Sequence, residues 1–484
     1  MPPKKSVQRS EFHHVRMQEH LREMDGPSLV ASSGEEQQQR LQGEQEEKQQ
    51  HQKGQQSYFV PSLISLCADV IAENFADIAA ADKLCEEDPK LYDMVIERLR
   101  TDLPLTVNVP RVRSDAYWRR CCEARWSFGQ LSERSCGKLV PPEREGWKQF
   151  YLERVLSDYL TGLRSHDLVG EESQQLDRLC IVSREYVYAL HLPCQTTRFD
   201  LYTQLLSRLP HLEHLRLTYG ANNVGTSFEW DMMGFSESDA ANVRYALNKY
   251  PPLRSLRLPN NRINSSLAKG ILSGLVLNTT LRVLDLSSNR IDDDGVRQLA
   301  LLLCRPDLPL EELYLHDNKI RGDGAAALGE ALTMNTTLRV LNLRLNRIPD
   351  EPGGVALVTG LASPTALEVL DLSHNALGDA TAQVLAEVLP KQTSLLSLNI
   401  SGNKALGLST GELLLQAVRE NATLRFLDAR SSGVAKECVA AMEACVESGV
   451  QAMKSQEVAA QEEEQRGRIL EYVETKLAKT LCVL

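Results

Sequence analysis

One pattern returns along the second half of the chain at a nearly constant interval. Its skeleton is L-x-x-L-x-L-x-x-N-x-I, and it is clearest in LRVLDLSSNRI, from Leu281, and in LRVLNLRLNRI, from Leu338. The last two copies are weaker. The interval alternates between 28 and 29 residues, with leading leucines at Leu253, Leu281, Leu310, Leu338, Leu367, Leu395 and Leu424. A fixed period of this length indicates a protein built from stacked structural repeats.

Each copy predicts a short strand, because the second and third leucines of L-x-x-L-x-L lie two residues apart and face the same side. The run after each strand, such as GVRQLALLLC at 295–304, predicts a helix. One strand and one helix cannot bury their own apolar faces, whereas stacked units share a core. Strands pack about 4.8 Å apart and helices roughly 8–10 Å apart, so the stack must curve.

The predicted fold is therefore α/β: a leucine-rich-repeat solenoid over residues 176–446, in which a curved parallel sheet carries helices on its outer side. The alternation of 28 and 29 residues resembles the ribonuclease-inhibitor type of repeat. The stretch NTTLRVL occurs at both 278–284 and 335–341. We interpret its NTT as the end of one helix and the turn into the next strand.

Six copies share an asparagine at the point where the chain leaves the strand and turns. A side-chain amide there can pair backbone groups that the turn would otherwise leave unpaired. We therefore predict a structural row of amides along the stack. Its members are Asn261, Asn289, Asn318, Asn346, Asn375 and Asn403.

The amino-terminal part of the chain has a different composition. Residues 1–57 are polar and rich in Gln and Glu, and we expect them to be disordered because they cannot bury enough apolar surface. Residues 58–175 predict an α-helical domain from their helical periodicity. One helix of this domain should carry Leu63, Leu66, Val70 and Phe75, among others, on a single buried face.

A second predicted helix begins in EDPKLYDMVIERLR, where Asp88 is the expected N-cap and Pro89 the first helical residue. Two more helices bear aromatic residues, in DAYWRRCCEARW and GWKQFYLERVLSDYL. Trp118, Trp126 and Trp147 lie in these segments, and we interpret them as core side chains.

The repeats begin before residue 253. LEHLRL at 212–217 has the leucine spacing, and YVYALHL at 186–192 predicts one earlier strand. The interval from Leu212 to Leu253 is longer than one repeat, and the excess includes GTSFEWDMMGFSES at 225–238. Two interpretations stay open for its aromatic and methionine residues, which include Phe235: an exposed contact for a partner, or a cover for the open edge of the early repeats.

Residues 447–484 predict a long helical cap or tail. Helix-forming residues dominate, and an apolar stripe runs through Ile469, Val473, Leu477 and Leu481. A solenoid needs a cap over its last repeat, so we expect the first part of this helix to supply one. Docking of the last turns onto another helix stays open.

The sequence shows no sign of catalysis. Nucleotide-binding, zinc-protease, nucleophile-elbow and kinase motifs are absent, so we predict a protein that is not an enzyme and that has no cofactor and no metal site. Eleven scattered cysteines favour a reducing compartment. We expect no secretory signal, membrane span or lipid anchor. The net charge of −11 disfavours nucleic acid as a partner.

What remains is a binding surface for another protein. The residues between the core leucines should face outward on the concave side of the sheet. In the middle of the stack they include Tyr314, His316, Asn342 and Arg344, on two adjacent strands. Tyrosine and arginine near the centre of a contact are favoured as hot spots, so we predict that these four residues form a partner-binding patch.

The helical segments carry a resemblance to a known family. LCADVIAENF at 66–75, YWRRCC at 117–122 and WKQFYLE at 147–153, followed by these repeats, resemble the T-complex-associated testis-expressed protein 1 family over roughly residues 58–446. That family is a subunit of the nexin–dynein regulatory complex. The resemblance implies a non-enzymatic part of the link between axonemal doublet microtubules, with other subunits of the complex and axonemal proteins as partners, in the cytoskeleton of the cilium or flagellum.

A second class of protein also combines helices with leucine-rich repeats. In F-box-like substrate receptors of ubiquitin ligases, residues 60–126 would bind an adaptor and the concave face a substrate. Activators of Ran-type GTPases use the same repeats, but they typically have a long acidic run after them. The run EEE at 462–464 is too short for one.

Overall fold

The computed structural model describes residues 62–78, 83–127, 129, 146–163, 168–220, 234–363, 365–403 and 407–481. The chain forms two compact units, residues 1–69 and residues 70–484. Of the first unit, only residues 62–69 are described. The segment 1–57, which we expect to be disordered, lies outside the described residues.

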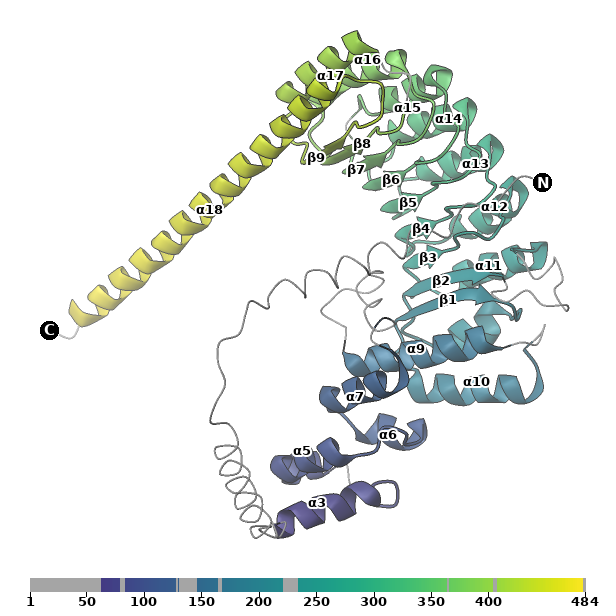
Figure 1. The fold of residues 1–484 in the computed structure, drawn as a ribbon, viewed down its shortest axis with the longest axis vertical. Helices are drawn as coiled ribbons and strands as arrows, with labels where there is room; N and C mark the ends of the chain where they lie inside the picture. The colour runs from purple at the N-terminus through teal and green to yellow at the C-terminus, as the bar shows by residue number, and fades with distance from the viewer. Residues whose placement is uncertain are drawn as a thin grey trace, which may run out of the picture. The chain divides into compact units, whose positions relative to one another are not determined.

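Nine strands form one parallel sheet, in which each strand pairs only with its neighbours in the sequence (Figure 1). The strands are β1 (Ala189–Gln195), β2 (His214–Tyr219), β3 (Ser255–Arg257), β4 (Val283–Asp285), β5 (Glu312–Tyr314), β6 (Val340–Asn342), β7 (Val369–Asp371), β8 (Ser397–Asn399) and β9 (Phe426–Asp428). The predicted leucine-rich-repeat solenoid is confirmed. The strand expected from residue 186 is also present, although it begins at Ala189.

A helix follows most strands, and the helices lie along the outer side of the sheet (Figure 1). They are α11 (Glu237–Lys249), α12 (Ser265–Leu272), α13 (Asp293–Leu303), α14 (Gly322–Leu332), α15 (Val355–Gly360), α16 (Asp379–Val388) and α17 (Leu408–Glu420). Between β1 and β2 the connection is made by two short turns, η3 (Leu201–Leu205) and η4 (Leu206–Arg208). None of these helices lies on the inner side of the sheet, which we call its open face (Figure 1).

The core is a continuous layer between the sheet and these helices. The strand leucines align in register from Leu256 on β3 to Leu427 on β9. Most are completely buried, and each such side chain contributes about 1.5–3 kcal/mol to the stability of the stack. The same core extends without a break from Leu156 to Val446, so the expected boundary after residue 175 falls inside it.

The helices before the sheet are α3 (Leu63–Glu73), α4 (Leu84–Glu87), α5 (Pro89–Arg98), α6 (Leu105–Arg111), α7 (Asp115–Arg125), α9 (Trp147–Gly162) and α10 (Gly170–Ser183). The predicted start of α5 is confirmed, because the Asp88 carboxylate accepts a hydrogen bond from Leu91 N. Trp118 and Trp126 are buried, as expected, and Trp147 is half-buried.

The expected buried face of α3 is wrong in part. Leu63, Leu66 and Val70 are exposed, and the buried side of the helix is the one that carries Ala72 and Phe75. In a short helix rich in both alanine and larger apolar residues, periodicity alone does not show which stripe meets the core.

Helix α9 is joined to the first strand by polar contacts. Glu153 Oε1 accepts hydrogen bonds from the backbone N–H groups of Tyr188 and Ala189, both at 2.9 Å. The buried Lys148 donates through Nζ to the carbonyl oxygen of Val109 and to Tyr186 Oη. Helix α9 therefore pairs with the backbone N–H groups at the start of β1, the first strand of the sheet.

At the other end, helix α18 (Lys436–Leu481) begins well before the expected residue 447. Its buried side chains are Val439, Met442 and Val446, so the cap over the last repeat precedes the predicted tail. No proline interrupts residues 436–481, so the cap and the tail form one continuous helix.

Residues 221–233, which include most of the stretch GTSFEWDMMGFSES, lie outside the described residues. Phe235, in the described part of that stretch, packs edge-to-face on Tyr219 with ring centroids 5.3 Å apart. Phe235 is 8% exposed. It is therefore a core residue, and its interpretation as part of an exposed contact is wrong.

Candidate interaction face of the repeat sheet

The open face of the sheet presents three columns of side chains that run across the strands. The register places Asp285, Tyr314 and Asn342 opposite one another on β4, β5 and β6. Tyr314 and Asn342, which the sequence assigns to one patch, are thus direct neighbours. His316 and Arg344 follow them by two residues each, at the carboxyl-terminal edge of the same strands.

Most of the middle column is polar for a local reason. In five strands an Asp or Asn side chain accepts a hydrogen bond from the backbone N–H two residues later, which closes a turn at the strand end. The accepting residues are Asp285, Asn342, Asp371, Asn399 and Asp428. Asn342 therefore contributes to the turn at Arg344 N, at 3.0 Å, as well as to the open face.

Arg257 and Tyr314 depart from this pattern and form a small network instead. The Arg257 guanidinium lies 5.2 Å from the centre of the Tyr314 ring and 3.8 Å from a carboxylate oxygen of Glu312. Tyr314 donates its hydroxyl hydrogen to Glu312 Oε2 at 2.9 Å. Burial and the Glu312 charge raise the pKa of Tyr314 to about 12, so the phenol stays protonated at neutral pH. The ring is half-buried and held in one orientation.

The other members of the predicted patch are less constrained. Arg344 is exposed and has no ion pair among the described residues. His316 is half-buried, and its Nδ1 has no hydrogen-bond partner in the described structure. The predicted patch thus combines the fixed ring of Tyr314 and the Asn342 side chain, which is hydrogen-bonded within its own turn. His316 and Arg344 are available for new contacts.

One residue beside the patch has an unfavourable backbone conformation. The residue before each of the six shared asparagines has a positive φ, at Asn260, Ser288, Asp317, Leu345, His374 and Gly402, and so does Ser431 at the corresponding position of the last repeat. All but one of these are polar residues or glycine. Leu345 has φ 57° and is 44% exposed. A branched apolar residue in the left-handed region costs about 1–2 kcal/mol, and sequence reasoning did not single it out.

The shared asparagines connect each repeat to the one before it at the carboxyl-terminal edge of the sheet. Asn318 Oδ1 accepts from Ile291 N at 3.0 Å, and its Nδ2 donates to the carbonyl oxygens of Leu286 and Leu315. Asn346 repeats the arrangement one strand later. The corresponding bonds of Asn261, Asn289, Asn375 and Asn403 also reach the preceding strand.

A second set of amides occupies the amino-terminal edge. Asn335 donates to the carbonyl oxygen of Leu303 and accepts from Leu338 N, both at 2.8 Å. Asn278 and Asn421 make the same contacts, so the interpretation of NTT as a helix end and turn is confirmed. The sequence signal was the recurring N-x-T, but the bond to the preceding repeat was not foreseen.

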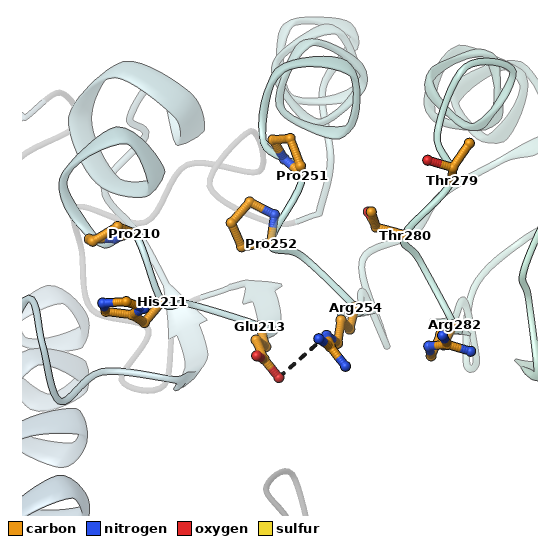
Figure 2. Close-up of a pocket in the computed structure, with 9 residues that line it drawn as sticks. All are labelled: Pro210, His211, Glu213, Pro251, Pro252, Arg254, Thr279, Thr280 and Arg282. Carbon is orange, nitrogen blue, oxygen red and sulfur yellow. Dashed lines mark ion pairs between the residues drawn. The ribbon is translucent and has the colours of Figure 1, made fainter.

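Charged residues at this amino-terminal edge are paired across neighbouring strands. Glu213 binds Arg254, Arg282 binds Glu311, and Arg339 binds Glu368. Figure 2 shows the first of these pairs beside a shallow hollow of about 320 Å³, which prolines and threonines also line. The hollow has an ion pair on its rim and offers no unpaired charge from Glu213 or Arg254.

The described residues contain neither a candidate metal site nor a candidate membrane span. No group of three or more His, Cys, Asp or Glu side chains there could hold a metal ion. The Nε2 atom of His211 lies 3.2 Å from a carboxylate oxygen of Glu185, and the His211 ring stacks on Tyr188. None of the helices in that part of the chain combines the length and hydropathy that a membrane span requires.

Comparison with known proteins supports both the fold and a narrower likeness. The family model described as Leucine Rich repeat matches residues 277–300, 308–329, 335–358 and 364–386. A mouse ribonuclease inhibitor is 33% identical over 94 residues, which cover 19% of this chain and 21% of that protein.

Two relatives are named dynein regulatory complex subunit 5. The one from Macaca fascicularis is 32% identical over 308 residues, covering 58% of this chain and 58% of that protein. The one from Chlamydomonas reinhardtii is 31% identical over 208 residues, covering 42% of this chain and 50% of that protein. The chain therefore spans between 50% and 58% of the length of these relatives.

Proposed function

We propose that this chain is a non-enzymatic subunit of the nexin–dynein regulatory complex, located in the axoneme of motile cilia or flagella. The observation that carries the proposal is the length of the match to dynein regulatory complex subunit 5. An alignment of 308 residues is longer than the whole predicted repeat region, 176–446, so the repeats alone do not account for it. The helical segments that carry the family resemblance lie outside that region.

The physical role that fits this chain is that of a rigid scaffold. Each repeat is bound to the next by strand pairing and by amide side chains at both edges of the sheet. A surface of this kind holds its side chains in fixed positions, which reduces the entropy lost when a partner binds. The proposed role is to hold neighbouring subunits in place within the link between doublet microtubules, and so to take part in the control of dynein.

We place the contact with another subunit on the patch of Tyr314, His316, Asn342 and Arg344. The network with Arg257 and Glu312 fixes the Tyr314 ring before binding. Arg344 offers a planar set of donors that suits a carboxylate or a carbonyl group. Such a pair, one immobilised aromatic ring and one exposed arginine, is typical of the centre of a protein interface.

The test replaces the endogenous protein with a Tyr314→Ala/Arg344→Ala variant and measures its incorporation into detergent-extracted, salt-washed axonemes. We expect loss of incorporation, because truncated hot spots weaken binding by about 2 kcal/mol or more. A matched control, Tyr245→Ala/Arg419→Ala, changes the same residue types on the outer helices α11 and α17 and should incorporate normally.

Two results would count against the proposal. If the wild-type chain washes out completely, it is not an axonemal subunit and a soluble role such as a ligase receptor gains support. If the wild type is retained and the Tyr314→Ala/Arg344→Ala variant is retained equally, the chain is axonemal but the interface lies elsewhere.

A further inference from the structure

The carboxyl-terminal edge of the sheet carries a cluster of exposed cations. Three of them, Arg290, Lys319 and Arg347, occupy the same position in consecutive repeats, directly after the shared asparagine. Arg321 and Arg344 lie beside them in sequence and are also exposed. The salt bridges found among the described residues include none of these five side chains. We call these five residues the basic edge.

Backbone contacts show that the members of the basic edge are spatial neighbours. Lys319 N donates to the carbonyl oxygen of Ile291, and Arg347 N donates to that of Ile320, so the three rungs follow one another across the stack. Adjacent strands lie about 4.8 Å apart. Like charges in such positions repel each other, and an unbound chain gains nothing from placing them there.

The opposite edge of the same sheet shows how the chain treats charge when only stability is at stake. There each of Arg254, Arg282 and Arg339 has an acidic partner on a neighbouring strand. The chain as a whole carries a net charge of −11. The cations of the basic edge, in contrast, have no ion-pair partner among the described residues.

Two aspartates that follow Arg290 in the sequence already accept hydrogen bonds from other groups of the chain. Asp292 binds Ser265 Oγ and Asp294 N, and Asp293 Oδ1 accepts from Arg321 N and Gly324 N. Asp317 is exposed and, like these two aspartates, forms no ion pair with the five cations among the described residues. The five cations of the basic edge are therefore free to pair with carboxylates from outside the chain.

An apolar group stands within this charged surface. Leu345 is exposed, lies between Arg344 and the shared Asn346, and occupies a position that is polar or glycine in the other repeats. Its neighbour across the strands is Asp317 on one side and His374 on the other. A purely electrostatic surface has no need of a leucine there, whereas a peptide with both acidic and apolar side chains would cover it.

We propose that the basic edge, with Leu345 at its centre, is the docking site for an acidic segment of a protein partner that inserts one apolar side chain against Leu345. Charge complementarity identifies the partner as an acidic polypeptide. The apolar contact separates it from a nucleic acid, which would need the cations alone. The proposal rests on the proposed scaffold role only in that the partner is another protein. Of the residues in the basic edge, Arg344 also belongs to the concave patch, and the other four lie beyond it.

The experiment measures binding of a fluorescein-labelled peptide of twelve residues, eleven glutamates with one central leucine, to the full chain by fluorescence anisotropy. A Lys319→Gln/Arg347→Gln variant should bind at least tenfold more weakly. The matched control Arg282→Gln/Arg339→Gln removes the same charge from the other edge and should stay within twofold of the wild type. Equal weakening by the two variants would mean that only net charge matters, and it would overturn the proposal.

Two further arms test the apolar contact and the class of ligand. Leu345→Asn should weaken the leucine-containing peptide about threefold and leave an all-glutamate peptide unchanged. Equal effects on both peptides would remove Leu345 from the site. A single-stranded DNA of twelve nucleotides should bind more weakly than the peptide, and tighter binding of the DNA would replace the acidic polypeptide with a nucleic acid. None of these arms depends on axonemal incorporation, so failure here leaves the proposed function intact, and the reverse also holds.

Discussion

At the carboxyl-terminal edge of the sheet, the amides of Asn318 and Asn346 bind backbone groups of the preceding repeat, and the cations beside them have no carboxylate partner among the described residues. At the amino-terminal edge, Asn278 and Asn335 bind the preceding repeat in a similar way, but the charges beside them are paired across the strands. The two edges thus share their amide chemistry and differ in their electrostatics.

The shared feature follows from the geometry of the repeat. Strands of only three residues leave many backbone groups unpaired where the chain turns, and buried groups of this kind must find partners. The electrostatic difference has no such cause, since neither edge needs charge to fold. It therefore points to an external contact at the edge that keeps its cations unpaired.

The largest expected effect is at the carboxyl-terminal amides. Asn318→Ala leaves the buried Ile291 N without a partner, and it removes one of the two amide donors from each of the carbonyl groups of Leu286 and Leu315. The free energy of unfolding should therefore fall by about 3 kcal/mol. Urea unfolding followed by circular dichroism measures this. The exposed neighbour Lys319→Ala is the control and should change stability by less than about 0.5 kcal/mol. A loss within that limit for Asn318→Ala would show that its bonds are replaceable by water.

The amino-terminal amides should contribute somewhat less. Asn335→Ala is expected to cost about 2 kcal/mol, because Thr337 Oγ1 still donates to the carbonyl oxygen of Leu308 and holds part of the turn. Thr336→Ala, at an exposed position, serves as the control in the same urea titration. A greater loss for Asn335→Ala than for Asn318→Ala would reverse the order of the two edges.

The aspartates near the carboxyl-terminal edge should make stability depend on acidity. Burial raises the pKa of Asp350, but hydrogen bonds from Thr381 Oγ1 and from the backbone N–H groups of Thr381, Gly378 and Ala380 outweigh it, and the net pKa is lowered. A carboxyl with a lowered folded pKa stabilises the protein above its unfolded pKa, about 3.9, and loses that contribution as the pH falls through the folded pKa.

Asp350→Asn removes this titration. Between about pH 5 and pH 2 the variant should lose about 1 kcal/mol less stability than the wild type, as expected for a helix-capping group. Melting curves across this range provide the measurement. Parallel pH profiles for the two proteins would mean that the Asp350 carboxylate is not coupled to folding.

The smallest effects separate the two edges by charge alone. Arg339→Gln breaks the 2.8 Å pair with Glu368 and should cost a few tenths of a kcal/mol, since the Arg339 side chain is largely exposed and the Glu368 side chain is partly exposed. Arg347→Gln should be neutral or stabilising by a similar amount, because it removes a like-charge neighbour of Lys319. Chemical denaturation at low and high salt compares them. A larger loss for Arg347→Gln would reveal a partner within the chain for that guanidinium.

The regular part of the fold could be predicted because its information is local and repeated. The interval of 28 and 29 residues sets the strand register, and the position of each shared asparagine follows from the same period. The groups that each amide binds were beyond the pattern, since they depend on the turn geometry of the previous repeat. Asn342 was assigned to a partner-binding patch, although its side chain also closes a local turn.

Irregular features were predicted less well. The start of α18 at Lys436 and the burial of Phe235 depend on contacts that occur once, at the ends of the stack. For α3 the periodicity identified a helix but not its buried stripe. The sequence contains the five residues of the basic edge but does not show that they lie side by side. Only the pairing of neighbours about 28 residues apart shows which charges lack a partner.

Helix α18 has a consequence for distances. Its 46 residues measure about 70 Å at a rise of about 1.5 Å per residue, whereas nine strands spaced about 4.8 Å apart span only about 40 Å. The last buried side chain that the structure describes in it is Val446, and from there the helix runs roughly 50 Å further, to Leu481. The helix would therefore act as a rigid spacer between a ligand bound at its far end and another bound on the sheet.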